Sequence, residues 1–240
     1  MMRNAAIPFY VASALAGLAL LLAGCQTTPA KPASSAPTTA LPSKPAEGSV
    51  QYTVDGTQSE VLFLVYKAGA LAKFGHNHTV EAHALQGDVY LAPAFKDSIF
   101  SLKLPVKDFE VDRSQARAAE GADFASKPSA QDIQGTTAHM LGPDCLDADK
   151  YPEVTLQSVS VTGSESDAEM TVRITLHGTA RDLKVPVTIA QNGDGLTASG
   201  DFELKQSEFG ITPYSALGGG LQVADALKVH FKIVAHKAAQ

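Results

Sequence analysis

Hydrophobic and polar residues alternate with a period of two along most of the chain from residue 49 to residue 240. In the segment 169–176, for example, Met170, Val172 and Ile174 are separated by polar or charged side chains. This is the period of a β-strand with one buried face. The same criterion predicts eight strands, over residues 60–66, 79–92, 98–106, 154–161, 169–176, 183–189, 196–204 and 227–233.

The connections between these segments favour an antiparallel, closed sheet. The sequence Asn192-Gly193-Asp194-Gly195 is typical of a tight turn, so the two strands that flank it should form a hairpin. Eight antiparallel strands with one apolar face each either pack as two sheets or close into a barrel, and closure removes exposed strand edges. We therefore predict an all-β fold, an eight-stranded antiparallel β-barrel.

Two long stretches interrupt the strands. Residues 113–151 are rich in Ala, Ser, Asp and Gln, and a short helix is predicted from about Ser126 toward Met140, where Gly142 follows and ends it. Residues 207–224 form a glycine-rich loop. Long connections of this kind commonly serve as lids or binding loops, so we expect both to lie over the mouth of the barrel.

The chain begins with a targeting signal rather than with part of the fold. Arg3 precedes an apolar stretch over residues 5–22, and small residues then lead to Cys25, which predicts a signal peptide over residues 1–24. An uncleaved membrane anchor is the alternative, since the apolar stretch is nearly long enough to cross a bilayer. The sequence Leu22-Ala23-Gly24-Cys25 resembles the bacterial lipobox, and this resemblance implies cleavage before Cys25 and acylation of that residue.

A spacer follows the signal and completes the predicted division of the chain. Residues 26–48 consist mostly of Pro, Ala, Ser and Thr and carry too little apolar surface to fold. We expect residues 25–48 to be a lipidated cysteine with its tether, and residues 49–240 to be the barrel domain. Gln26 stands where an Asp would, by resemblance to Gram-negative sorting, retain a lipoprotein in the inner membrane. The periplasmic face of the outer membrane is therefore preferred to the inner membrane as the location.

Composition and charge exclude several classes of protein. The chain has 19 Lys and Arg against 25 Asp and Glu, a net charge of −6, and no basic run, so no nucleic-acid partner is expected. Its two cysteines cannot form a disulfide framework or a four-thiolate metal site. Cys145 has no catalytic motif around it and no Gly-x-Ser-x-Gly sequence is present, so we do not expect an enzyme.

The inward face of the barrel is the candidate binding site. A barrel of eight strands is wide enough either to be filled by its own side chains or to hold one small ligand, and the alternation is the same in both cases. The inward positions are apolar and uncharged, so a ligand would have to be apolar. Ten residues are candidates for the lining, because they are large and occupy inward positions in the alternating pattern. They are Phe63, Val65, Phe100, Leu102, Leu104, Val172, Ile174, Val187, Phe202 and Phe231.

Two histidines raise the alternative of a metal site. His76 and His78 would project to the same side of a strand, as two ligands of one ion do, but His83 is out of phase with them as a third ligand. A polar turn is therefore preferred to a metal site, and neither a metal nor any other cofactor is predicted to be required.

Three acidic residues alternate in the same way near residue 110. Asp108, Glu110 and Asp112 would share one face of a strand. We interpret this face as charged and solvated rather than as a calcium or acid–base site, because acid–base chemistry needs a pocket and shifted pKa values.

Six motifs carry a resemblance to a known family. They are Tyr52-Thr-Val-Asp55, Phe74-Gly-His-Asn-His78, Tyr151-Pro-Glu-Val154, Leu176-His-Gly-Thr-Ala-Arg181, Phe209-Gly-Ile211 and Val223-Ala-Asp225. In order and spacing they resemble the YceI family over about residues 50–235. The resemblance implies a lipocalin-like barrel whose lumen, in some members, holds a long isoprenoid or fatty-acyl chain, and it implies secretion to the periplasm.

These observations favour a lipid-anchored periplasmic protein that binds or shuttles a long apolar ligand, an isoprenoid or acyl lipid, and contacts the membrane through N-terminal acyl chains. One alternative is a metal-binding or redox-partner protein that uses His76 and His78. Another is a structural or stress-response envelope protein whose barrel is filled solid and whose loops bind another protein. The sequence makes no prediction of oligomeric state.

Overall fold

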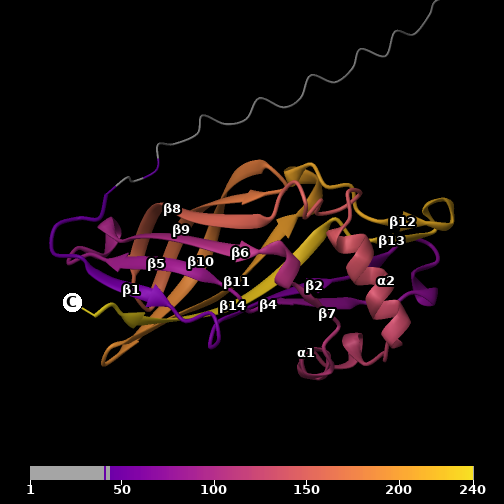
Figure 1. The fold of residues 1–240 in the computed structure, drawn as a ribbon, viewed down its shortest axis with the longest axis horizontal. Coiled ribbons are helices and arrows are strands. Elements are labelled where there is room, and N and C mark those ends of the chain that lie inside the picture. Colours follow the sequence, from indigo (N-terminus) through magenta and orange to yellow (C-terminus); the bar gives the residue numbers. More distant parts are fainter. Residues whose placement is uncertain (1–40, 42–43, 240) are drawn as a thin grey trace, which may run out of the picture. The chain divides into compact units, whose positions relative to one another are not determined.

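Eight strands form a closed antiparallel β-barrel in the computed structural model, which describes residues 41 and 44–239 (Figure 1). Each strand of the ring pairs with the next in this order, and the last pairs again with the first: β1 (Val50–Val54), β5 (Gln86–Leu91), β6 (Ile99–Pro105), β8 (Glu153–Ser164), β9 (Asp167–Leu176), β10 (Thr179–Asn192), β11 (Gly195–Lys205) and β14 (Ala226–Lys237). The predicted fold class is confirmed.

The sheet continues beyond the ring at one end, because β14 pairs with two strands along its length. Residues 228–232 of β14 pair with β2 (Glu60–Val65), whereas residues 235–237 pair with β1. Strand β2 pairs in turn with β4 (His78–Ala82), and β4 pairs with β7 (Glu110–Val111). The barrel wall is therefore longer on the side of β2 and β4.

The number of ring strands is as predicted, but their membership is not. The single strand predicted over residues 79–92 is two strands, β4 and β5, which pair with different neighbours. The chain leaves the sheet at residues 83–85, where the carbonyls of His83 and Leu85 lie against Gly56 so closely that a Cβ there would be 3.0 and 2.7 Å from them. Strand β1 has one buried side chain, Tyr52, and so has no detectable alternation.

The insertion between β7 and β8 contains two helices, α1 (Ser114–Ala119) and α2 (Ala130–Leu141). Helix α2 is the predicted helix, and it begins with a capping box: the Ser129 hydroxyl accepts the Asp132 backbone N–H, and the Asp132 carboxylate accepts the Ser129 backbone N–H. The helix ends at Gly142, as predicted.

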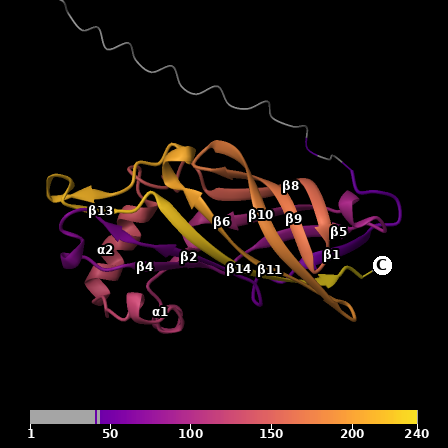
Figure 2. The same cartoon turned by 180° about the vertical axis from the view of Figure 1, so that it is seen from behind.

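The glycine-rich segment packs at the same end of the barrel as α2 (Figures 1 and 2). Its strands β12 (Ser215–Ala216) and β13 (Leu221–Val223) join β3 (Lys67–Ala68) in a separate three-stranded sheet. Short 3-10 turns complete the fold, at η1 (Ala72–Phe74), η2 (Phe95–Asp97), η3 (Val106–Asp108), η4 (Ala122–Phe124), η5 (Gln206–Phe209) and η6 (Leu217–Gly219).

The end of the barrel that holds β1 lies away from α2 (Figure 1). Leu196 and Ala235 face each other across β11 and β14 there and are fully buried. Tyr52 is buried beside them, and its hydroxyl donates to Gln191 Oε1 at 3.2 Å.

In the part of the chain that the structure describes, no helix is long and apolar enough to cross a bilayer.

Candidate functional site

A cavity of about 440 Å³ lies inside the barrel. Apolar side chains line it from every strand of the ring except β1, and from β2 and β4. Its volume falls within the range of about 300–1,000 Å³ found for small-molecule sites. The interior is therefore not filled by the protein's own side chains, which argues against the solid-barrel alternative.

The structure places all ten residues selected from the sequence on the cavity wall. They are Phe63, Val65, Phe100, Leu102, Leu104, Val172, Ile174, Val187, Phe202 and Phe231. Three of the phenylalanines belong to aromatic pairs that stiffen the wall: Phe202 and Phe231 have ring centroids 6.2 Å apart, and Phe63 stacks on Phe109 at 5.7 Å.

The mouth of the cavity is built from the two segments that interrupt the strands. Helix α2 contributes Thr136, His139 and Met140, and the segment after β11 contributes Gln206 and Tyr214. The rings of His139 and Tyr214 meet edge to face at 4.5 Å, so the two segments touch each other. Sequence reasoning missed these residues, because strand alternation carries no information about which side chains of a loop or helix reach the lumen.

Among the described residues, no Asp, Glu, Lys or Arg lines the cavity. The polar side chains on its wall are His78, Thr136, His139, Gln206 and Tyr214, and the thiol of Cys145 also contributes. Burial raises the pKa of the Cys145 thiol above its ordinary value, so this cysteine is a neutral part of the wall and not an activated nucleophile. An ionised group inside this cavity would lose its hydration without gaining a counter-charge.

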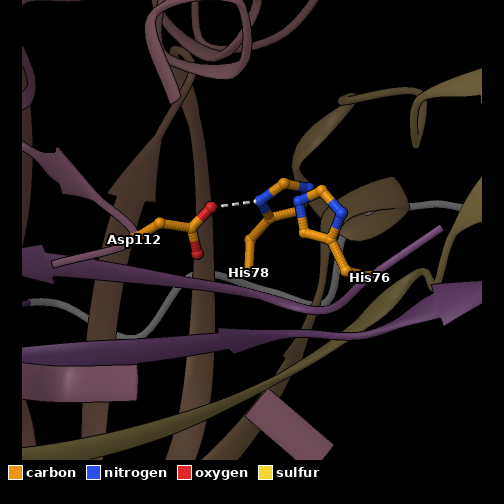
Figure 3. Close-up of side chains that lie close together, drawn as sticks. All are labelled: His76, His78 and Asp112. Carbon is orange, nitrogen blue, oxygen red and sulfur yellow. Dashed lines mark hydrogen bonds and ion pairs between the residues drawn. The ribbon is translucent and has the colours of Figure 1, made fainter. Parts of the chain in front are cut away.

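Beside the cavity, two histidines and one aspartate lie close together (Figure 3). The Nδ1 atom of His78 is 2.6 Å from Oδ2 of Asp112, and the rings of His76 and His78 have centroids 4.5 Å apart. One potential ligand atom from each of the three residues lies within 4.8 Å of the others. We call these three residues the His–Asp cluster.

The interpretation of Asp112 as part of a solvated face is wrong. Its side chain is fully buried, whereas Asp108 and Glu110 are exposed. Asp112 follows β7 with a left-handed backbone (φ 55°), so the period of two does not extend to it. Its Oδ1 accepts the backbone N–H of Thr79 at 3.0 Å and Nη1 of Arg117, from α1, at 2.5 Å.

The surroundings determine the protonation states in the cluster. Burial alone would raise the pKa of Asp112. The hydrogen bond and the charge of His78 act in the opposite direction, as do the hydrogen bonds that Thr79 and Arg117 donate. Together they outweigh burial and hold this pKa below its ordinary value. Burial lowers the pKa of His76, and the charge of His78 lowers it further. Asp112 is therefore ionised and His76 neutral at neutral pH.

His83, considered from the sequence as a third metal ligand, lies in a different group. Its Nε2 is 2.7 Å from Nη1 of Arg113 and 3.5 Å from a carboxylate oxygen of Glu81. Cys25, the predicted lipidation site, and the signal peptide over residues 1–24 lie outside the described residues, as does most of the tether.

A family model described as a YceI-like domain matches residues 52–235 of this chain. The chain belongs to this family. A comparison with curated proteins gives no match. The two solved structures described next have 20% and 12% sequence identity, so their likeness to this YceI-like chain concerns the fold.

Two solved structures illustrate the likeness. The first is BcnA of Burkholderia cenocepacia, with 20% identity and a TM-score of 0.55, where the alignment covers 75% of this chain and 98% of that chain. The second is described as a polyisoprenoid binding domain from Saccharophagus degradans, with 12% identity and a TM-score of 0.54, covering 79% of this chain and 99% of that chain. Both agree with the YceI-like barrel.

Substituting Asp112→Ala should destabilise this YceI-like domain strongly, because the guanidinium of Arg117 would remain buried without a counter-charge. Removing one member of a buried ion pair costs about 3–5 kcal/mol. Urea denaturation compared with the wild type measures the loss. The control is Asp108→Ala at an exposed position, which should change stability by less than about 0.5 kcal/mol. Equal small effects of both substitutions would show that the Asp112–Arg117 pair does not stabilise the fold.

Proposed function

We propose that this protein binds a long apolar molecule, an isoprenoid or an acyl lipid, inside its barrel. The observation that carries the proposal is the apolar cavity, whose wall has no charged side chain among the described residues. The similarity to a domain described as polyisoprenoid-binding supports the same class of ligand. Burial of each methylene group contributes roughly 0.8 kcal/mol, so affinity comes mainly from the length of chain enclosed.

The cavity also limits where the ligand's head group lies. The polar wall residues His139 and Tyr214 belong to the mouth, and the opposite end is closed by Leu196 and Ala235. The apolar chain therefore enters first and the head group stays among the polar side chains of the mouth. A charged head group would have to remain outside the cavity, in water.

The mouth region also supports the exchange of ligand with a membrane. Phe74 on η1 and Leu217 on η6 are 70% and 69% exposed, and among the described residues only Tyr214 is a further large apolar side chain that is exposed. Their two segments are joined by a hydrogen bond of 2.7 Å from the Leu71 N–H to the Gly220 carbonyl. We call Phe74, Leu217 and the adjacent Lys73 the apolar tip; the ammonium of Lys73 is 5.0 Å from the Phe74 ring centroid.

The occupant that we propose for the apolar tip is a lipid bilayer. Aromatic and aliphatic side chains beside a lysine are the combination that binds the interfacial region of a membrane with anionic lipids. The η6 turn joins β12 to β13, and Val223 of β13 lines the cavity. A tip inserted into the headgroup region would bring the mouth to the place where an apolar ligand leaves the membrane.

The anchoring of the protein is part of the same proposal. The lipobox-like sequence ending at Cys25 and the proline-rich tether support a periplasmic lipoprotein, with Gln26 favouring the outer membrane. Two or more acyl chains give stable attachment without a membrane-spanning segment. A tethered barrel would keep its mouth within reach of the bilayer surface.

The ligand itself tests the principal proposal. Organic extraction of the purified protein should yield an isoprenoid or acyl lipid by mass spectrometry, and the lipid-free protein should bind an added polyprenol. Substituting Ala198→Phe fills part of the cavity and should weaken polyprenol binding by about tenfold or more, which corresponds to about 1.4 kcal/mol. The control is Ser199→Phe, the next residue of β11, which is not on the cavity wall. No copurifying lipid together with no polyprenol binding would refute the proposal.

Acylation is tested at Cys25. Cells given labelled palmitate should incorporate label into the wild-type protein and into the Cys145→Ser variant, but not into the Cys25→Ser variant, which has no thiol at the lipobox. Fractionation of the envelope then distinguishes outer from inner membrane. Incorporation of label into the Cys25→Ser variant would contradict the proposed anchor.

The apolar tip is tested by the rate of ligand transfer. The double variant Phe74→Ser, Leu217→Ser should bind polyprenol with unchanged affinity but transfer it to vesicles containing phosphatidylglycerol several-fold more slowly, because the tip no longer inserts. The control is Lys184→Ala, an exposed lysine in β10 on the barrel wall. An unchanged transfer rate in the double variant would show that the tip does not contact the membrane.

A further inference from the structure

We propose that His76 and His78 bind one transition-metal ion, zinc or copper, and that Asp112 orients His78 for this purpose. The site goes beyond the proposed binding of an apolar ligand and does not depend on it. Three independent features of the His–Asp cluster carry the inference: the tautomer imposed on His78, the unpartnered nitrogen of His76, and the rigid support of Asp112.

Asp112 determines which nitrogen of His78 is available to a metal ion. The carboxylate already accepts hydrogen bonds from Thr79 N–H and Arg117 Nη1, so it is an acceptor toward His78 as well. The proton between Asp112 Oδ2 and His78 Nδ1, which are 2.6 Å apart, therefore belongs to the imidazole. In the neutral ring, the lone pair is then on Nε2. A carboxylate that holds the far nitrogen of a ligating histidine is a recurrent feature of metal sites.

His76 provides the second nitrogen. Its ring lies beside that of His78, on the side away from Asp112 (Figure 3). The Nε2 atom of His76 is buried and has no hydrogen-bond partner among the described residues. A buried nitrogen without a partner is costly, and coordination of an ion shared with His78 would satisfy it.

The support of the cluster is rigid, because its parts come from three elements and the loop before β4. His78 begins β4, Asp112 follows β7, Arg117 belongs to α1, and Arg117 Nη1 also donates to the carbonyl of Asn77 at 2.7 Å. Asn77 lies between the two histidines, so this bond fixes the backbone that carries both. The ring of His78 and the backbone next to His76 are thus held in place before any ion binds.

The charges and ligand types decide which ions fit. The negative charge of Asp112 is balanced by Arg117 at 2.5 Å, so little net negative charge remains to attract a hard cation such as Mg²⁺ or Ca²⁺. Imidazole nitrogens prefer zinc, copper and similar ions. His78 also lines the cavity, so an ion on its ring would lie beside the space proposed for the ligand.

Metal titration of the purified full-length protein tests the proposal. After treatment with a chelator, the wild type should bind one Zn²⁺ or Cu²⁺ per chain in a saturable calorimetric titration, and the variants His76→Ala and His78→Ala should each lose tenfold or more in affinity. The matched control is His230→Ala: the Nδ1 atom of His230 also contacts a carboxylate, that of Asp201, but no second imidazole is paired with its ring among the described residues. This variant should bind like the wild type.

A second readout separates coordination from loss of structure. Cobalt substitution should give visible absorption bands of nitrogen-coordinated Co²⁺ in the wild type and in His230→Ala, but not in His76→Ala, whose metal-free melting temperature should match that of the wild type. The absence of saturable binding to the wild type would overturn the proposal. So would binding that survives both substitutions, or binding that is lost equally in His230→Ala, which would indicate adventitious surface coordination.

Discussion

The pairing of one long strand with two different neighbours is the constraint on which the rest of this structure depends. At its C-terminal end β14 pairs with β1 and closes the ring; earlier it pairs with β2, which leads to β4 and β7. At the end where β14 pairs with β1, Leu196 and Ala235 are fully buried. The other end has a longer wall, over which α2 and the segment after β11 form the mouth.

The fold places one buried ion pair beside the cavity, between Asp112 and Arg117. A buried Asp–Arg pair rarely stabilises a protein more than apolar residues of the same volume, because both charges lose their hydration. Here Asp112 and Arg117 connect β7, α1 and the backbone at Asn77. Their arrangement fixes the conformation of the chain around His76 and His78. The desolvation cost of this ion pair therefore serves to position the two histidines and not to stabilise the core.

The strands and the wall of the cavity follow from local sequence, whereas the His–Asp cluster does not. Residues such as Val172 and Phe202 reach the lumen because a strand places alternate side chains on one face, which holds wherever the strand is regular. The break at residues 83–85 depends on contact with Gly56, which is distant in sequence. Asp112 is buried because its left-handed backbone and Arg117 place it there; neither is visible in an alternating pattern of acidic residues.

The uncharged cavity and the polar mouth recognise different parts of a ligand, the apolar chain and the head group. An apolar wall distinguishes chains by the length and volume that it encloses, and each added methylene changes affinity gradually. Polar groups discriminate more sharply, because a buried donor or acceptor left unpaired is penalised. In this barrel the polar side chains of the cavity wall include Thr136, His139, Gln206 and Tyr214 at the mouth, and His78 in the His–Asp cluster. Selectivity among ligands with similar chains therefore depends on these polar groups, most of which lie at the mouth.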